Sequence, residues 1–222
     1  MKSAELVKTL KMYKKRVVTI NDIEKITGKP GTYVSLILAK NKEFRRIERG
    51  KYYLSGTDIY EIASNIIAPS YISILSALRY YNLITQMPNT IDVVSTRQHK
   101  ELFLEGYKVR FVKLSKKRVF GYKIEEGAFI AEIEKAIVDS VYLGIDYSYL
   151  NEALQNCIKE IDIEKLKKYA MAMDSKIIIN KIGFMLEELG VNAEDLIDNR
   201  SMRYAVINGT ANINSRWRVR YA

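Results

Sequence analysis

The chain of 222 residues is 48% hydrophobic and 28% charged, which is the balance of a folded globular protein rather than of a disordered one. Its length suits two small domains. The single cysteine excludes an intrachain disulfide framework, and no stretch reaches the roughly 20 mostly apolar residues that a membrane span needs. The first residues do not resemble a secretory signal, so we expect a soluble cytoplasmic protein with no membrane partner.

The net charge of +10 is concentrated near the N-terminus. Residues 1–56 contain 14 Lys and Arg against 5 Asp and Glu, a net charge of +9, whereas residues 57–222 contain 22 against 21. Within this second part, residues 121–199 are acidic, with 8 cations against 16 anions. A basic block confined to a quarter of the chain is typical of a module that binds nucleic acid.

Residues 1–56 favour a small domain of helices and short strands. Asn21 as N-cap, Glu24 as its capping-box partner and Gly28 as the stop define one short helix. Apolar spacing and β-branched content add two helices and a strand. The elements expected in this region span 3–13, 16–20, 21–27 and 30–40.

The stretch FRRIERGKYYLSG, residues 44–56, predicts a β-hairpin with its turn at 48–51. Helix, strand, helix, helix and hairpin follow one another as in a winged helix-turn-helix. In that geometry the second helix of the motif lies in the major groove, and the cations of the hairpin, or wing, meet phosphates. The residues predicted to bind DNA are Lys29, Thr32, Tyr33, Ser35, Lys40, Lys42, Arg45, Arg46, Arg49 and Lys51.

A second interpretation of the same domain stays open. Winged helices also serve as protein-binding modules, so the chain could be a non-enzymatic adaptor whose wing binds an acidic protein partner. Binding to the chain's own promoter DNA separates the two.

Residues 57–222 predict a mixed α/β domain with a small antiparallel sheet and several helices, which makes the chain α+β. Thr57 is expected to cap a first helix and Ser70 to begin a second one. Three strands follow, of which the last two are expected to pair as a hairpin with a basic tip, and the chain is expected to be helical from Phe129. The expected strands span 90–96, 108–115 and 119–125.

Two clusters of cations in this domain suggest a second basic surface. One is the expected hairpin tip, and the other is the tail SRWRVRYA, in which Trp217 and Tyr221 should face the core while the arginines point outward. Solubility and the protection of a sheet edge explain such cations equally well. The residues are Lys116, Lys117, Arg118, Arg216, Arg218 and Arg220.

Enzymatic interpretations find little support. One histidine and one cysteine cannot make a zinc site of Cys and His ligands, and no phosphate-binding glycine loop occurs. Cys157 lies among apolar residues and is interpreted as a buried thiol. The remaining alternative is a metal-dependent nuclease that uses Glu132, Glu134 and Asp139, although their spacing on a helix does not make them converge. We expect no catalytic residue, no metal and no cofactor.

The order of these elements resembles the abortive-infection E antitoxin family, the transcriptional regulators of type IV toxin–antitoxin operons. The resemblance covers most of residues 1–200 and rests on RIERGKYYL, APSYISILSALRYYNLITQMPNTIDVVST and AEIEKAIVDSVYL. It is strongest at residues 69–78 and at Glu134, Lys135, Ala136 and Asp139, although family members often have arginine where Lys135 stands.

The resemblance implies an antitoxin for viral defence that represses its own operon by binding inverted repeats in the promoter. It further implies functional pairing with a nucleotidyltransferase-like toxin, which need not involve a stable complex. Glu134 and Asp139 would then have an architectural role. The winged helix would bind the operator and the second domain would oppose the toxin.

Overall fold

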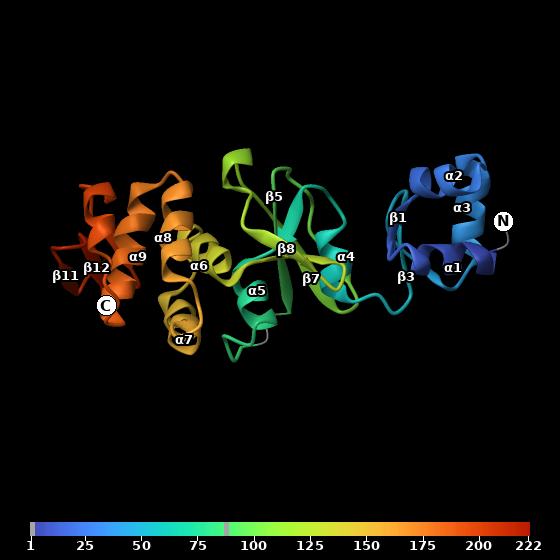
Figure 1. Cartoon of the computed structure of the whole chain (residues 1–222). Helices are drawn as coiled ribbons and strands as arrows, with labels where there is room; N and C mark the ends of the chain where they lie inside the picture. The colour runs from blue at the N-terminus through green and yellow to red at the C-terminus, as the bar shows by residue number, and fades with distance from the viewer. Residues whose placement is uncertain (1–2, 87–88) are drawn as a thin grey trace.

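The computed structural model describes residues 3–86 and 89–222 of the chain. Three parts lie in a row, with the first helices at one end, a sheet in the middle, and helices and short strands at the other end (Figure 1). The two termini lie at opposite ends of this row. The architecture is therefore α+β. No helix in the described ranges has the length and apolar character that crossing a bilayer requires.

The first part consists of three helices and a three-stranded antiparallel sheet with the order β1–β3–β2. Its buried side chains, among them Leu10, Ile23, Val34 and Leu38, form a small core of their own. The elements are α1 (Ser3–Met12), β1 (Val17–Thr19), α2 (Ile20–Thr27), α3 (Gly31–Lys40), β2 (Phe44–Glu48) and β3 (Lys51–Leu54).

Both faces of this small sheet are covered. Alternate residues of a strand point to opposite faces, and here Tyr52 and Leu54 belong to the core of the first helices while Tyr53 belongs to the larger core of the rest of the chain. Ile47 joins Tyr53 in that larger core. The sheet therefore lies between the N-terminal helices and the central part of the molecule.

Two helix caps differ from the sequence-based prediction. Thr19, not Asn21, caps α2: its hydroxyl accepts from the backbone of Asp22, whose carboxylate accepts from the backbone of Thr19 in return. Asp58, not Thr57, caps α4 and accepts from the backbone of Tyr60. In both cases another residue with a capping side chain lies one or two positions away, and sequence alone does not distinguish between them.

The central part is a six-stranded mixed sheet with the order β6–β7–β5–β4–β9–β8. Antiparallel pairs flank the parallel pairs β5–β7 and β4–β9. The elements are α4 (Ile59–Ser64), β4 (Ser70–Ile72), α5 (Ile74–Tyr80), β5 (Thr90–Ser95), β6 (Leu102–Leu104), β7 (Tyr107–Lys113), the 3-10 helix η1 (Lys116–Arg118), β8 (Tyr122–Glu125) and β9 (Ala128–Ala131).

The predicted hairpin over 108–125 is wrong. Its first strand, β7, pairs with β5 and β6, and its second, β8, pairs with β9 at the opposite edge of the sheet. The segment Lys116–Arg118 that was expected to be the tip is a 3-10 helix in a crossover. Strand pairing depends on long-range partners, so adjacency in sequence was a poor guide.

Residues 70–72 and 128–131 are strands, although the sequence predicted helices there. Ser70, Tyr71 and Ile72 are all buried because β4 lies between β5 and β9 in the middle of the sheet. Strands covered on both faces are continuously apolar, without the alternation that marks a surface strand. Such short apolar runs do not differ from buried helix segments in sequence.

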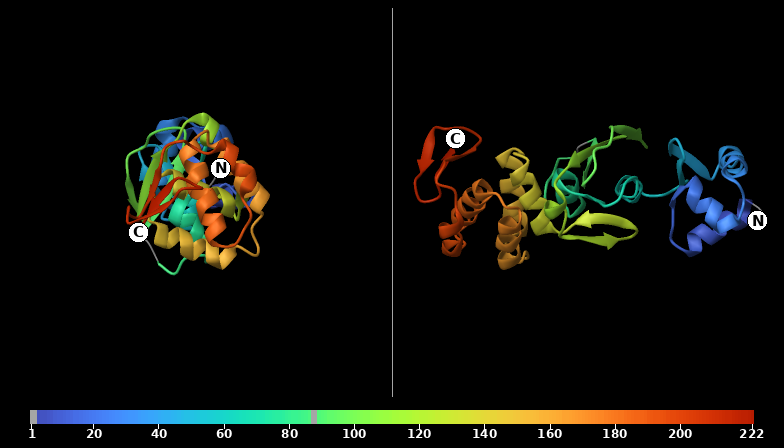
Figure 2. Two further views of the ribbon diagram at one scale, coloured as in Figure 1. Left: turned by 90° about the vertical axis from the view of Figure 1, so that its left-hand side faces the viewer. Right: turned by 90° about the horizontal axis from the view of Figure 1, so that it is seen from above.

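Four helices stand beside the sheet, and a second three-stranded sheet ends the chain (Figure 1, Figure 2). In that sheet β12 lies between β10, to which it is parallel, and β11, to which it is antiparallel. The elements are α6 (Ile133–Tyr142), α7 (Tyr147–Cys157), α8 (Ile163–Ala172), α9 (Lys176–Glu188), the 3-10 helix η2 (Glu194–Asn199), β10 (Ala205–Ile207), β11 (Asn212–Asn214) and β12 (Val219–Tyr221).

Trp217 fastens the C-terminal sheet to α9. The indole is fully buried, its N–H donates to a carboxylate oxygen of Glu187 at 2.7 Å, and its ring lies directly over Gly183. The alternation expected for the tail holds in part: Trp217 is buried and Arg216 and Arg220 are exposed, whereas Tyr221 and Arg218 are half-buried. Tyr221 packs on the core from the strand, and Val219 is buried with Trp217. Arg218 has a φ of 52°, so only Val219–Tyr221 is a regular strand.

Candidate nucleic-acid interface

Helix α3 presents one polar face to solvent and one apolar face to the first core. Val34 and Leu38 are completely or almost completely buried. Residues three, four and seven positions apart share a face of a helix. The opposite face is therefore formed by exposed residues that begin just before the helix: Lys29, Thr32, Tyr33, Leu36 and Lys40.

Leu36 lies on the same face as the residues predicted to bind DNA, although the sequence-based prediction did not include it. Its side chain is 59% exposed, next to Tyr33 at 49%. The spacing from Thr32 and Tyr33 places it on the same face, so the helical period was the signal that could have identified it. Ser35, which was predicted, lies toward the side of this face, is half-buried, and donates its hydroxyl to the carbonyl of Gly31 at 2.8 Å.

The register of the hairpin keeps its cations apart. Arg45 lies opposite Tyr53, Arg46 lies opposite Tyr52, and the last pair is Glu48 with Lys51. Like charges directly opposite each other would destabilise the ladder. This register sets each cation against an aromatic ring or a carboxylate, so the basic hairpin is compatible with a stable pair of strands.

Two of the four hairpin cations point toward the central part of the molecule. Arg45 Nη1 lies 2.7 Å from Oε1 of Glu105, in the turn between β6 and β7, and the hydroxyl of Tyr53 donates to the same oxygen. Lys51 Nζ donates to the carbonyl of Ile66 at 2.7 Å. Hydrogen bonds from Tyr53 and Arg45 lower the pKa of Glu105, which keeps this carboxylate charged.

Glu48 connects the hairpin to the only histidine of the chain. One carboxylate oxygen lies 2.9 Å from Lys51 Nζ and the other 3.3 Å from Nε2 of His99, whose ring packs against Phe111. Burial raises the pKa of Glu48, but Lys51 and His99 outweigh it and lower the pKa overall. The inner face of the hairpin is thus held by charge as well as by apolar packing.

The remaining hairpin cations stay accessible. Arg46 is exposed and donates only to the backbone carbonyl of Glu48, and Arg49 is exposed at the turn. Within residues 3–86 and 89–222, the side chain of Arg49 contacts no carboxylate, and neither do those of Lys29, Lys40 and Lys42. The accessible part of the predicted site is therefore the outer face of α3 together with Lys42, Arg46 and Arg49.

A separate polar cluster is buried between the sheet and α6. The ammonium of Lys135 pairs with the carboxylate of Asp139, which also accepts from the hydroxyls of Tyr71 at 3.0 Å and Ser73 at 2.8 Å. Lys135, Asp139 and Ser73 are fully buried. Burial raises the pKa of Asp139 and lowers that of Lys135, and their pairing opposes both shifts.

This cluster brings together the two sequence stretches on which the family resemblance rests most strongly. It lies beside Ile74, whose φ of 59° is unusual for a β-branched residue. The hydrogen bond from Ser73 to Asp139 restrains the residue just before this strained position. The contacts give Asp139 an architectural role.

The three carboxylates considered for a nuclease do not form one group, although Glu132 and Glu134 meet at the same lysine. Lys165 Nζ lies 2.8 Å from Glu132 and 3.4 Å from Glu134, whereas Asp139 belongs to the separate buried cluster. No group of three or more His, Cys, Asp or Glu side chains in the described part of the chain could hold a metal ion. Lysine neutralisation accounts for all three acids.

Half of the residues in the two further basic clusters are paired with acids or carbonyls of the same chain. Lys117 pairs with Asp174, and Arg118 donates to the carbonyl of Met173 and to the hydroxyl of Tyr142. Arg216 bridges Glu187 and Glu194. Within the described ranges, the other three cations do not pair in this way. Lys116 is exposed, and Arg220 is exposed and lies over the ring of Tyr204. Arg218 contacts the sulfur of Met202.

Cys157 is fully buried in α7. Burial raises the pKa of its thiol to about 12, and Glu134 and Glu160 act in the same direction. The thiolate is the nucleophilic form of cysteine, so this side chain is an inert packing group at neutral pH.

Comparison of the sequence with protein-family models gives no matching family, and comparison with curated proteins gives no matching relative.

Proposed function

We propose that the protein is a DNA-binding transcriptional regulator whose residues 1–56 act as a winged helix-turn-helix domain. One observation carries the proposal: α3 buries Val34 and Leu38 and turns a row of polar and basic residues outward. The order of elements and the β1–β3–β2 sheet are consistent with α3 as the recognition helix and the β2–β3 hairpin as the wing.

The accessible residues divide by the part of DNA that each would contact. Thr32 and Tyr33 lie in the first turn of α3, where recognition helices reach base edges. Lys40, Lys42, Arg46 and Arg49 carry the charge that phosphates require, which gives affinity and register but no sequence information. Four phosphate contacts correspond to a slope of about −3.6 for log K against log salt concentration.

The proposal extends to the regulatory role that the family resemblance implies. The protein would be the antitoxin and autorepressor of a type IV toxin–antitoxin operon for viral defence, binding inverted repeats in its own promoter. Residues 57–222 would oppose a nucleotidyltransferase-like toxin. The packing of Tyr71 and Ser73 on Asp139 supports this extension, because it gives the matched stretches a shared structural purpose.

The experiment measures binding of the full chain to labelled duplexes from its own upstream region by fluorescence anisotropy at several salt concentrations. We expect Arg46→Glu with Arg49→Glu to weaken binding to all duplexes and to flatten the salt slope. Thr32→Ala should instead change the preference between the upstream duplex and a scrambled one. The matched control is Lys159→Glu with Lys168→Glu, which makes the same change in charge at two exposed positions near α7 and α8, away from the hairpin.

Equal loss of DNA binding in the two double variants would show that net charge alone explains the effect, and this would overturn the proposal. Absence of binding to any upstream duplex at low salt would do the same. The antitoxin role has its own readout, which is growth rescue of cells that express the neighbouring toxin. We expect the wing variants to lose repression and keep rescue.

An acidic protein partner for the wing is the second candidate. It is favoured by Arg45 and Lys51, which already meet carboxylates of this chain in Glu105 and Glu48. If the wing binds proteins, addition of the chain should leave the anisotropy of the labelled upstream duplex unchanged. The same charge reversals should then abolish association with the protein partner.

A further inference from the structure

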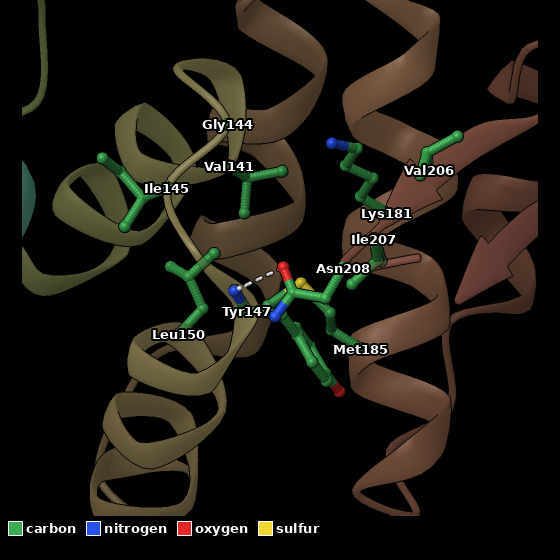
Figure 3. Close-up of a pocket in the computed structure, with 10 residues that line it drawn as sticks. All are labelled: Val141, Gly144, Ile145, Tyr147, Leu150, Lys181, Met185, Val206, Ile207 and Asn208. Carbon is green, nitrogen blue, oxygen red and sulfur yellow. Dashed lines mark hydrogen bonds between the residues drawn. The ribbon is translucent and has the colours of Figure 1, made fainter. Parts of the chain in front are cut away.

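A cavity of about 100 Å³ lies between the α6–α7 connection and the α9–β10 region. Buried apolar side chains of Val141, Leu150, Met185 and Ile207 form its floor, and the exposed residues Gly144, Val206 and Asn208 form its rim. Figure 3 shows Asn208 in the middle of the view, where its side-chain oxygen accepts from the backbone of Tyr147 at 3.2 Å. The buried part of the lining is therefore apolar, and Asn208 adds a polar group at the rim.

Lys181 is the one cation of this cavity. It extends from α9 toward the side where Val141 and Gly144 lie (Figure 3). Its side chain is half-buried and makes no hydrogen bond or ion pair within residues 3–86 and 89–222. Burial lowers its pKa, and no neighbouring charge contributes to that shift.

This isolation distinguishes Lys181 from every other lysine of the described residues that is buried or half-buried. Each of the others contacts a carboxylate. These lysines are Lys51, Lys108, Lys135, Lys165 and Lys167. The distance from the lysine nitrogen to the carboxylate oxygen is 2.7 to 2.9 Å for Lys51, Lys108, Lys165 and Lys167. A half-buried ammonium without a counter-charge is costly. Among the buried and half-buried lysines of residues 3–86 and 89–222, Lys181 is the one without a carboxylate partner.

The carboxylate of Asp146, which binds the rim residue Asn208, is already engaged. Asp146 accepts from the backbone and hydroxyl of Ser148 and from the side-chain amide of Asn208 at 2.9 Å, which ties the start of α7 to the end of β10. It caps α7 and contributes nothing to the pKa of Lys181. Within residues 3–86 and 89–222 no carboxylate pairs with Lys181, so its ammonium is available to an anionic ligand.

We propose that this cavity binds a small aliphatic monocarboxylate, with its carboxylate on the ammonium of Lys181 and its hydrocarbon against Val141, Leu150 and Met185. One cation and apolar walls fit a monoanion with a hydrocarbon body, whereas a phosphate would need several further donors. An apolar cavity of about 150 Å³ holds benzene, which has six non-hydrogen atoms. The space here is about two thirds as large and so holds about four, which suits the hydrocarbon part of a small branched acid whose carboxylate lies beside Lys181. This inference does not depend on DNA binding.

The test titrates the full chain with sodium isobutyrate and follows chemical shifts of the methyl groups in a carbon–proton NMR spectrum. We expect saturable shifts at Val141, Leu150 and Ile207. Isobutyramide, which has the same shape and no charge, should bind at least tenfold more weakly. In the series acetate, propionate and isobutyrate, affinity should rise about fourfold for each carbon added.

Lys181→Met should weaken isobutyrate binding at least tenfold while the fold is kept, because methionine retains the unbranched apolar stem and removes the ammonium group. The matched control is Lys176→Met, the same change at an exposed position of the same helix. Val206→Phe, on an exposed strand position at the rim, should also weaken binding by narrowing the mouth.

Three results would overturn the proposal. The first is a titration with isobutyrate that does not saturate up to about 50 mM, since a dissociation constant near 1 mM is the weakest that we would count as binding. The second is equal affinity for the acid and the amide. The third is an equal loss of binding in Lys181→Met and Lys176→Met. Melting temperatures of all variants, measured alongside, show whether a loss of binding comes from unfolding.

Discussion

Arg45 and Glu105 lie 60 residues apart in the chain, yet Nη1 of the arginine is 2.7 Å from a carboxylate oxygen of the glutamate. Arg45 faces the same side of the small sheet as Tyr53, whose hydroxyl donates to the same carboxylate. The contact fastens the hairpin to the turn between β6 and β7. It also occupies one of the cations expected at the phosphate backbone of DNA.

Removal of the Glu105 charge should therefore release Arg45 to DNA. In Glu105→Gln the amide oxygen still accepts from Tyr53, but the guanidinium loses its counter-ion. Under the proposed function we expect tighter binding at low salt and a salt slope steeper by about 0.9, the value for one added phosphate contact. Anisotropy with an upstream duplex measures both.

Glu101→Gln is the control for this experiment. It removes the same charge from a nearby exposed pair, Glu101 with Lys108, that does not contact the hairpin. If both variants steepen the slope equally, net charge explains the effect and Arg45 has no part in it.

The buried pair of Lys135 and Asp139 should be important for stability. Asp139→Asn leaves a fully buried ammonium without its counter-charge, which costs about 3–5 kcal/mol in the free energy of unfolding. Urea unfolding followed by circular dichroism measures the change in midpoint. Asp174→Asn makes the same substitution in the exposed pair with Lys117 and should leave the midpoint nearly unchanged. Similar midpoints for the two variants would contradict the role assigned to the buried pair.

Glu132 should make stability depend on pH below neutrality. Burial alone raises its pKa, but Lys165 and the hydroxyl of Tyr169 outweigh burial and lower the pKa overall. A carboxylate with a lowered folded pKa stabilises the fold above its unfolded pKa of about 4.3, and this stabilisation is lost as the pH falls through the folded value.

The urea midpoint of the natural chain should therefore exceed that of Glu132→Gln by its largest amount at pH 7, and the difference should disappear below about pH 4. Glu160→Gln, at an exposed position after α7, is the control and should show a smaller gap at pH 7. A gap for Glu132→Gln that stays constant from pH 7 to pH 3 would show that its charge is not the cause.

Gly183→Ala should displace Trp217. A Cβ at this position would lie 2.1 to 2.4 Å from atoms of the indole ring, which is far closer than van der Waals contact. We expect a loss of about 1–3 kcal/mol through overpacking and a red shift in the fluorescence of Trp217, the only tryptophan of the chain. Gly31→Ala is the matched helical control, because there the near atom is the mobile carboxylate of Glu24. Unchanged emission in Gly183→Ala would show that the packing tolerates the methyl group.

The amino-acid sequence by itself determined the features that depend on neighbours along the chain. Apolar spacing predicted a helix over 30–40, where α3 buries Val34 and Leu38, and the helical character expected after Phe129 is present in α6, α7, α8 and α9. The alternation of apolar residues with arginines in the tail predicted the burial of Trp217 and the exposure of Arg216 and Arg220, although Tyr221 is only half-buried. These patterns are local because a helix or strand repeats its faces every few residues.

Only the tertiary structure decided which segments become neighbours. It turned residues 70–72 and 128–131 into central strands, separated β7 from β8, and gave Arg45 and Lys51 partners in the central part of the molecule. It also left Lys181 without one. The type of each residue gives the charge and polarity of its side chain. Its hydrogen-bond or ion-pair partner often lies tens of residues away in the chain and is brought close by long-range packing, which no local pattern encodes.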